Sequence, residues 1–347
     1  MSSIQNSVPR SQDLKFLHEM NQLSKHHYLN SVEYRRIVDS LFSGVSEASH
    51  IGELPFLPVT LFKEFELKSV PEGDIFKILL SSGTAGAQSK IYLSQQNARK
   101  QSEVLHELFK NKFGSTRVPM IVFDSPTQIS SVKAANARTA AVIGFSGFAS
   151  KRHFVLDEDL TLNWDYLEEL SEFYEDQYVI FFGFTFILWK TLFLEDDRDR
   201  SFRFKKSALL HGGGWKKLES LNVQRNEFRS IMSAKLGLTK VFDYYGMAEQ
   251  AGSIYFECTA GYFHTTAFGK VLIRDMVTLR PLDFGVTGII QVLSTIPTSY
   301  PGHSLLTQDL GTAHGVDDCI CGEVGTYFTI QGRIPKSEVR GCSDVLA

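Results

Sequence analysis

Residues 163–189 read NWDYLEELSEFYEDQYVIFFGFTFILW, and this stretch decides the fold class. Its first part, 163–177, has the apolar spacing of an amphipathic helix, with hydrophobic residues three and four positions apart. The apolar run that follows, 178–184, predicts a buried strand, and the segment up to Trp189 begins a second helix. The apolar run 178–189 has twelve residues. A helix that crosses a bilayer needs about 20, so we expect no membrane span here.

The same signals repeat on both sides of this stretch. A helix is predicted to begin after Ser94, a favourable N-cap, and to end before Gly114. Another helix within 224–237 likewise ends at a glycine. Strands that alternate with such helices predict a layered α/β sheet. Further strands of this region are predicted at 75–81, 118–124, 206–211 and 240–246.

The two ends of the chain differ from this central pattern. The first 70 residues look mostly helical, because 13–29 repeat apolar residues at helical spacing. After about residue 252 the helical period disappears, and short apolar runs between Gly or Pro turns predict a small β subdomain. The predicted organisation is a helical segment packed on the main domain, an α/β region, a β subdomain and a short C-terminal arm. Their predicted bounds are 1–70, 71–251, 252–331 and 332–347.

Composition excludes several classes of protein. The net charge is −3 with a pI near 6.4, and no basic run stands out, so nucleic acid is not an expected partner. The N-terminus has no apolar core of a signal peptide. With four cysteines, the chain is therefore expected in the reducing cytoplasm, where thiols bind metals or do chemistry. The 27 phenylalanines indicate a large apolar interior or an apolar substrate pocket.

A loop of small and hydroxyl residues follows the strand at 75–81. It reads LLSSGTAGAQSK, residues 79–90. Its glycines let the backbone approach a ligand, and successive N–H groups with serine and threonine hydroxyls suit a phosphate. It is not a nucleotide-triphosphatase P-loop, because only two residues separate Gly83 from Gly86 and because Lys90 leads into a strand. A plain turn is the alternative interpretation.

Four further stretches follow this loop in order along the chain. They read HGGGWK (211–216), YYGMAEQ (244–250), LLTQDLG (305–311) and IQGRI (330–334). In the third stretch, Asp309 is a lone carboxylate before a predicted turn, and a turn cap is its alternative role. Together with the first loop, this series resembles the ordered motifs of the adenylate-forming superfamily. Within it, the chain is most similar to the acyl-protein synthetase family, which is related to the phenylacetate–CoA ligases. The stretches that match this family are LPFLPVTLFK (54–63), HGGGWKK (211–217), PGHSLLTQDLG (301–311) and GRIPKSEVRGCSD (332–344).

The resemblance implies a fold, a reaction and a set of roles. The fold would be the N-terminal domain of adenylate-forming enzymes, with region 71–251 binding ATP and the acyl group, and without the usual mobile C-terminal domain. ATP, Mg²⁺ and a carboxylic acid would give acyl-AMP and pyrophosphate. Glu249 would hold Mg²⁺, and Tyr245 would stack on the adenine. The implied phosphate set is Ser81, Ser82, Gly83, Thr84, Gly86 and Lys90, with no firm role for Lys90. The implied adenine and ribose set is Gly212, Gly213, Gly214, Tyr244, Tyr245, Gly246, Met247, Asp309 and Arg333.

Some residues depart from the superfamily pattern. Ala248 stands where a threonine usually precedes the acidic residue. Only 14 residues follow Arg333, so the lysine of the C-terminal domain that grips the reacting carboxylate has no counterpart. The candidates to replace it are Lys216, Lys336 and Arg340, and Lys216 is taken as a catalytic candidate. The tail cysteine, Cys342, matches the acyl-accepting cysteine of the acyl-protein synthetases, and an ordinary tail cysteine is the alternative.

The other three cysteines form a set with one histidine. Cys258 and His264 have the spacing C-x5-H, and Cys319 and Cys321 form C-x-C. On a strand, residues two apart point the same way, so both thiols of the second pair can share one ion. Three thiolates and one imidazole are typical of a closed structural zinc site. Buried cysteines without a metal are the alternative.

The sequence therefore predicts a ligase that forms carbon–sulfur bonds. It would activate a fatty or similar apolar acid, load the acyl group on Cys342 as a thioester and deliver it to an acyl reductase. A second hypothesis is an adenylating ligase that passes the acyl group to coenzyme A or to a carrier-protein thiol. A third, of another class, is a non-catalytic nucleotide-binding protein, which Ala248 and the missing lysine favour.

Overall fold

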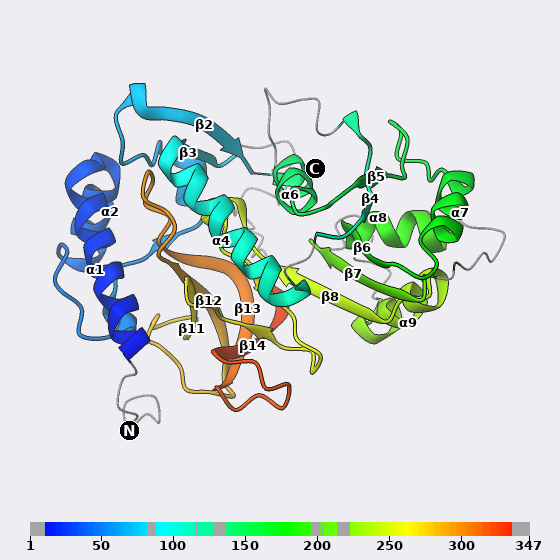
Figure 1. The fold of residues 1–347 in the computed structure, drawn as a ribbon. Helices are drawn as coiled ribbons and strands as arrows, with labels where there is room; N and C mark the ends of the chain where they lie inside the picture. Colours follow the sequence, from blue (N-terminus) through cyan, green and yellow to red (C-terminus); the bar gives the residue numbers. More distant parts are fainter. Residues whose placement is uncertain are drawn as a thin grey trace, which may run out of the picture.

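The computed structural model of the protein contains a parallel sheet, an antiparallel sheet and a two-stranded ribbon (Figure 1). The two larger sheets are separate and are covered by helices, as the sequence predicts for a layered α/β protein. The structure describes residues 11–81, 88–114, 117–127, 137–195, 202, 204–213 and 223–334.

The parallel sheet has the strand order β5-β4-β6-β7-β8-β9, and only β9 is antiparallel to its neighbour. In parallel strands the carboxyl ends meet at one edge of the sheet, which makes this edge a common place for ligands. The strands are β4 (Met120–Phe123), β5 (Arg152–Phe154), β6 (Tyr178–Phe184), β7 (Lys206–Gly212), β8 (Lys240–Tyr245) and β9 (Tyr255–Phe256).

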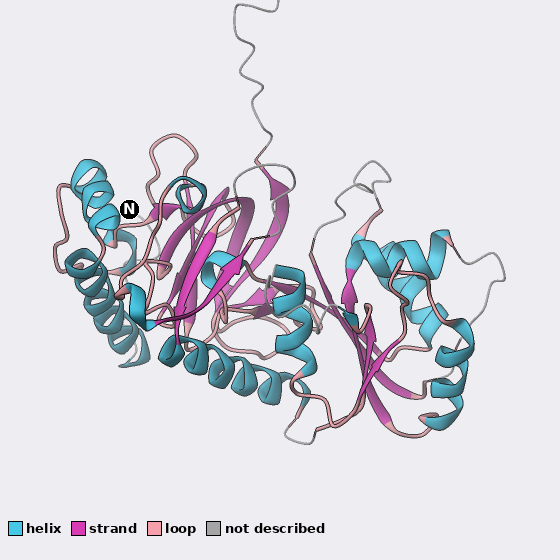
Figure 2. Ribbon diagram, turned by 90° about the horizontal axis from the view of Figure 1, so that it is seen from above, coloured by secondary structure: helices cyan, strands magenta, loops and turns pink. Residues whose placement is uncertain are grey.

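Helices cover both faces of the parallel sheet (Figure 2). Neighbouring residues of one strand point to opposite faces, so Phe181 packs in one cluster and Phe182 in the other. The Phe181 side is covered by α7 (Trp164–Phe173), α8 (Thr185–Trp189) and α9 (Arg225–Leu236). The Phe182 side is covered by α4 (Gln95–Phe113) and α6 (Ala137–Ser146). Burial on both faces explains the continuous apolar strands of the sequence.

The antiparallel sheet has the order β10-β14-β13-β12-β11, and β1 pairs in parallel with β13. Its longest strand, β13, has 13 residues, and the sequence had indicated only a turn after Asp309 in this region. The strands are β1 (Leu57–Pro58), β10 (Phe263–His264), β11 (Gly269–Arg274), β12 (Thr287–Ser294), β13 (Ser304–Val316) and β14 (Thr326–Arg333).

The N-terminal part packs on the antiparallel sheet. Tyr34 and Val38 of one helix are fully buried in the same cluster as Ile290 and Leu305 of the sheet. A ribbon of two strands then leads to α4, which begins at the N-cap Ser94 and ends at Gly114 as the sequence predicts. These elements are α1 (Ser11–Asn30), α2 (Val32–Phe42), α3 (Leu61–Glu64), β2 (Ile75–Leu80) and β3 (Lys90–Ser94).

Short helical turns complete the fold. They are the 3-10 turns η2 (Ile51–Glu53), η3 (Glu72–Asp74) and η7 (Ala248–Gln250) and the π-helical turn η5 (Lys190–Leu194), which continues α8. Among the described helices, none combines the length and the apolar character that a membrane span requires.

Two buried histidines join α1 to the segment before β13. His27 donates from Nε2 to the carbonyl of Pro297 at 3.2 Å and accepts at Nδ1 from the Ser69 hydroxyl at 2.8 Å. The His303 ring lies 4.7 Å from the His27 ring, and its Nε2 is 3.0 Å from the Ser24 hydroxyl. Burial is the main reason that the pKa of His27 is well below its usual value and that the pKa of His303 falls to about 3. Both rings are therefore neutral in the folded protein.

A fall in pH should weaken the packing of His27 and His303. Unfolded histidine gains its proton near pH 6.5, whereas the folded rings resist protonation, so their stabilising contribution is complete above pH 6.5 and is lost as the pH falls. We expect the free energy of unfolding to fall by about 1.4 kcal/mol per pH unit and per histidine. Urea unfolding at pH 7.5, 6.5 and 5.5 measures this slope. The slope should be shallower in His303→Gln and unchanged in His18→Gln, an exposed site. Equal slopes in all three proteins would contradict the assignment.

Candidate functional site

The carboxyl edge of the parallel sheet meets one end of the antiparallel sheet. The link is a hydrogen bond of 2.7 Å from the hydroxyl of Tyr245, the last residue of β8, to Oδ2 of Asp309 in β13. Figure 1 shows β8 extending from the parallel sheet toward β13 and β14. Two residues that the sequence assigned to one nucleotide site are thus in contact, although 64 positions separate them.

Two glycines at the end of β7 leave its backbone uncovered by side chains. A Cβ on Gly212 would overlap the ring of Tyr244, so only glycine lets this strand lie against that ring. Gly213 has a φ of +78°, a left-handed conformation that favours glycine. The two glycines together leave bare backbone beside an aromatic ring, and this arrangement suits a planar group such as a nucleobase.

His211 is the residue before these glycines, and its imidazole is fixed by a hydrogen bond within the protein. Its Nδ1 lies 3.0 Å from the Thr185 hydroxyl, which donates to the carbonyl of Gly212 at 3.3 Å. The hydroxyl therefore accepts from Nδ1, and the imidazole is neutral, because burial lowers the pKa of His211 to about 3. One hydroxyl at the start of α8 thus fixes the end of β7.

Glu249 lies in the 3-10 turn η7 and is 9% exposed, so it is not the solvated strand end that an isolated acidic residue would suggest. The neighbouring Gln250 anchors this turn to the antiparallel sheet. Its amide donates to the carbonyls of Gly302 at 2.9 Å and Val292 at 3.3 Å. The space around Gly302 is also narrow, because a Cβ there would overlap the carbonyl of Glu249. The sequence alone does not indicate a role for Gln250, since an amide next to a motif is no signal by itself.

The surroundings of Asp309 differ from the turn that the sequence indicated. Asp309 lies inside β13, paired with Arg333 of β14, and the register shifts between Leu310 and Gly311. Its Oδ1 is 3.6 Å from Nε of Arg333, whose side chain is 81% exposed. Asp309 itself is 17% exposed. Oδ2 is thus held by the Tyr245 hydroxyl, and Oδ1 pairs with a side chain that is exposed.

Two members of the phosphate set lie in the described residues. The amide of Ser81 donates to the carbonyl of Ser89 at 3.0 Å, and the amide of Ser89 donates to the Ser81 hydroxyl at 3.0 Å. Ser81 therefore closes the base of the loop. Lys90 is about half exposed and forms an ion pair with Glu66 at 3.6 Å. The remaining loop and tail candidates lie outside the described residues, namely Ser82, Gly83, Thr84, Gly86, Gly214, Lys216, Lys336, Arg340 and Cys342.

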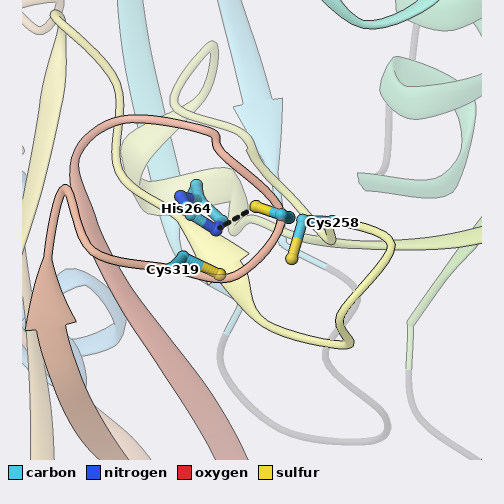
Figure 3. A group of neighbouring side chains, drawn as sticks. Cys258, His264 and Cys319 are labelled. Atoms are coloured by element: carbon cyan, nitrogen blue, oxygen red, sulfur yellow. Dashed lines mark hydrogen bonds between the residues drawn. The ribbon is translucent and has the colours of Figure 1, made fainter.

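The four predicted metal ligands come together (Figure 3). The ligand atoms of Cys258, His264, Cys319 and Cys321 all lie within 4.8 Å of one another. His264 donates from Nδ1 to the carbonyl of Val324 at 3.3 Å, which leaves Nε2 facing the Cys321 sulfur at 3.4 Å. A metal-binding histidine is usually oriented by such a bond from its other ring nitrogen. The donor set and its orientation fit a tetrahedral zinc ion.

The C-x-C pair reaches this cluster differently from the sequence prediction. Cys319 and Cys321 lie in the turn between β13 and β14 and not on a strand. The turn is closed by a bond of 2.9 Å from the Gly322 amide to the Cys319 carbonyl, and Gly322 has a φ of +79°. The Glu323 amide then donates to the Cys321 sulfur at 3.3 Å. A tight turn, and not strand alternation, brings the two sulfurs to one side.

A buried ion-pair network supports the other half of the cluster. Glu257 is fully buried and is paired with Arg225 at 2.9 Å and with Arg229, both on α9. Arg225 also donates to the carbonyl of Gly261 at 3.0 Å, in the turn between Cys258 and His264. Burial and the neighbouring Glu257 raise the pKa of Asp243, on β8, to about 7. No sequence motif marks this network, because its members are far apart along the chain.

Comparison with known proteins gives a consistent result. The family model described as "Acyl-protein synthetase, LuxE" matches residues 10–347. A long-chain-fatty-acid–luciferin-component ligase of Vibrio harveyi is 22% identical over 330 residues, covering 92% of this chain and 84% of the relative. The protein of the same name from Aliivibrio fischeri is 24% identical over 300 residues, covering 82% and 75%.

Solved structures show the same architecture. A 2-hydroxyisobutyryl-CoA ligase, in an open conformation with 2-HIB-AMP and CoA, matches with a TM-score of 0.71 and 16% identity. The match covers 95% of this chain and 75% of that one. At this identity the likeness concerns the fold, and it confirms the predicted adenylate-forming fold class.

The contribution of Gln250 to the stability of the turn that contains Glu249 should be measurable. Gln250→Leu removes the donor to the buried carbonyl of Gly302, and leaving such a group unpaired costs about 1–3 kcal/mol of unfolding free energy. Urea unfolding of the variant measures the loss. The matched control is Gln96→Leu, in the exposed first turn of α4, which should stay within about 0.5 kcal/mol of the wild type. If both variants are equally stable, Gln250 does not anchor the turn.

Proposed function

Because the chain belongs to the acyl-protein synthetase (LuxE) family, we propose that it activates a fatty or other apolar carboxylic acid with ATP and Mg²⁺. The acid's carboxylate attacks the α-phosphorus, the bond to pyrophosphate breaks, and acyl-AMP forms. The thiolate of Cys342 then attacks the acyl carbonyl, the bond to AMP breaks, and a thioester remains on the enzyme.

One observation carries this proposal. Backbone glycines at the end of β7, the carboxylate of Glu249 and the Tyr245–Asp309 pair lie along one edge where the two sheets meet. A nucleotide needs such a combination of groups. Asp309 would accept hydrogen bonds from ribose hydroxyls, the Gly212–Gly213 backbone would take the base, and Glu249 would hold Mg²⁺. When bound, Mg²⁺ would screen the phosphate charge that opposes attack by a carboxylate.

The acyl group is proposed to lie beside the nucleotide, where β6 ends. Phe184 caps α8 and lies next to Gly213, at which a Cβ would be 3.2 Å from the Phe184 ring. Phe184 is itself only partly buried, as a residue that lines a ligand site can be. An apolar ring beside the base site suits a hydrocarbon chain. The names of the two bacterial relatives, which are long-chain fatty acid ligases, support the same class of acid.

The acceptor distinguishes this proposal from its alternatives. We propose Cys342 as the acceptor and an acyl reductase as the partner that receives the thioester, because the tail motif resembles that of the family. Coenzyme A is the main alternative acceptor, and the 2-hydroxyisobutyryl-CoA ligase with a similar fold was solved with CoA. A protein that only binds the nucleotide would release no pyrophosphate.

Intact-protein mass after incubation with ATP, Mg²⁺ and carboxylic acids of increasing chain length tests the acceptor. We expect one acid to add its acyl mass in a form that hydroxylamine removes, and we expect Cys342→Ser to lack this adduct. Pyrophosphate release is followed in parallel. It should persist in Cys342→Ser and fall about 10²- to 10³-fold in Glu249→Gln, because the transition-state charge is no longer screened.

The other outcomes identify the alternatives. Pyrophosphate release that depends on the acid, without an adduct, would show an outside acceptor and would remove Cys342 from the mechanism. ATP binding without any release, with every acid tried, would favour the non-catalytic hypothesis. Equal release by Glu249→Gln and wild type would remove Glu249 as the Mg²⁺ ligand.

We also propose that Cys258, His264, Cys319 and Cys321 hold a structural zinc ion. The site would tie the turn after β9 to the turn between β13 and β14. Lys112 at the end of α4 pairs with Glu323 of the same turn at 2.8 Å, so the turn also contacts the helix that covers the parallel sheet. The reducing cytosol that the cysteine content indicates would keep these thiols available for a metal.

Metal analysis of the purified protein should find about one zinc per chain. Cys319→Ser should lose the zinc and lower Tm by about 5 °C or more, because a closed site contributes to folding. Cys342→Ser should keep the zinc, since this residue is outside the set. A wild-type protein without zinc, or a Cys319→Ser variant with its full zinc content, would contradict the site.

A further inference from the structure

The two carboxylate oxygens of Asp309 have different partners. Its carboxylate is 17% exposed, its Oδ2 accepts from Tyr245 at 2.7 Å, and its Oδ1 faces the exposed Arg333 side chain at 3.6 Å. Its amide donates to the Thr307 hydroxyl at 3.1 Å. Oδ2, the inner oxygen, is therefore committed to Tyr245, whereas Oδ1, the outer oxygen, has an exposed side chain as its partner.

Tyr245 is a rigid and permanent donor in this arrangement. Its ring lies among the rings of Tyr255 at 6.2 Å, Phe328 at 6.3 Å and Phe263 at 6.4 Å, from three different strands. Burial, and then the charge of Asp309, hold the pKa of the Tyr245 hydroxyl well above its ordinary value. The hydroxyl consequently keeps its proton across the pH range in which proteins work. A donor to an ionised carboxylate forms a stronger hydrogen bond than a donor to a neutral group.

The strands are irregular at this point. Leu310 pairs with Gly332, but the next residue, Gly311, pairs with Ile330, so β14 has one extra residue here. Gly332 has a φ of +128°. Bulges of this kind re-aim side chains and are frequent next to binding sites. The bulge lies directly beside the Asp309–Arg333 pair.

We propose that Tyr245 is a positioning residue for the nucleotide ribose. Its hydroxyl fixes the Asp309 carboxylate so that the outer oxygen can accept from the vicinal hydroxyls. This inference rests on the proposed function, because it assigns the second role to a residue of the same ATP site. The role is distinct from stacking on adenine, because it belongs to the hydroxyl and not to the ring. It also makes the site depend on the junction of the two sheets, since Tyr245 comes from one and Asp309 from the other.

The test uses Tyr245→Phe, which keeps the ring and removes the hydroxyl. KM and kcat for ATP, 2′-deoxy-ATP and 3′-deoxy-ATP are measured with the best acid of the panel. In the wild type, each deoxy nucleotide should raise KM. In the variant, KM for ATP should rise about tenfold, the size of a charge-assisted hydrogen bond, with kcat within about twofold. The penalty for removing a ribose hydroxyl should shrink at the same time, because the carboxylate that receives it is no longer fixed.

Tyr255→Phe is the matched control. It removes a hydroxyl from the same aromatic cluster, where Tyr255 donates to the carbonyl of Lys270 at 3.2 Å and does not contact Asp309. If the tyrosine hydroxyls only stabilised the aromatic cluster, both variants should change KM for ATP to a similar extent. Neither variant should then alter the ratio of the KM values for ATP and its deoxy forms. The pair Tyr245→Phe and Asp309→Asn adds a second criterion. If the tyrosine acts through the carboxylate, the double variant should bind ATP no more weakly than Asp309→Asn alone.

Calorimetric binding of the same three nucleotides separates this inference from the proposed reaction. If the wild type binds ATP but releases no pyrophosphate, the proposed reaction fails, and the binding ratios still decide the role of Tyr245. A wild-type ratio between ATP and deoxy-ATP that persists unchanged in Tyr245→Phe would overturn the inference while the reaction stands. Absence of ATP binding by the wild type would overturn both.

Discussion

The hydrogen bond between Tyr245 and Asp309 connects the parallel sheet to the antiparallel sheet. A carboxylate that is mostly buried needs a donor, and this donor comes from the end of β8 in the other sheet. Gln250 makes a second connection a few residues later, with its amide on the carbonyls of Val292 and Gly302. The candidate site lies between these two connections. Its geometry therefore depends on how the sheets are joined, more than on either sheet alone.

Each sheet is stiff for a different reason. The parallel sheet is covered by helices on both faces, and its phenylalanines alternate between two apolar clusters. The antiparallel sheet packs against α2, and its Phe328 shares an apolar cluster with Tyr255 of β9, in the parallel sheet. Close-packed interiors transmit displacement because they contain little free space. A rigid body on each side explains how a few polar contacts at the junction can fix the positions of functional side chains.

The central α/β pattern was predictable because it depends on local signals. The period of apolar residues, the N-cap Ser94 and the stop at Gly114 each act within a few residues, and the structure confirms them. Strand β13 was harder to predict from the sequence, because the polar Asp309 and the glycines around it are typical of a turn. The C-x-C pair was predicted to share one ion, and its sulfurs do lie together, but through a turn closed at Gly322.

By itself the sequence determined the fold class, the order of the motifs and the family, since these depend on residue types and spacing along the chain. It also identified the cysteines and the histidine of the metal cluster as candidate ligands, because few residue types bind zinc. Only the tertiary structure decided which oxygen of Asp309 is held, why Gln250 matters, and how Glu257 is neutralised by two arginines of α9. These features join residues that are tens of positions apart. Their energy comes from burying a polar or charged group next to its partner, and that partner is identified only when the chain has folded.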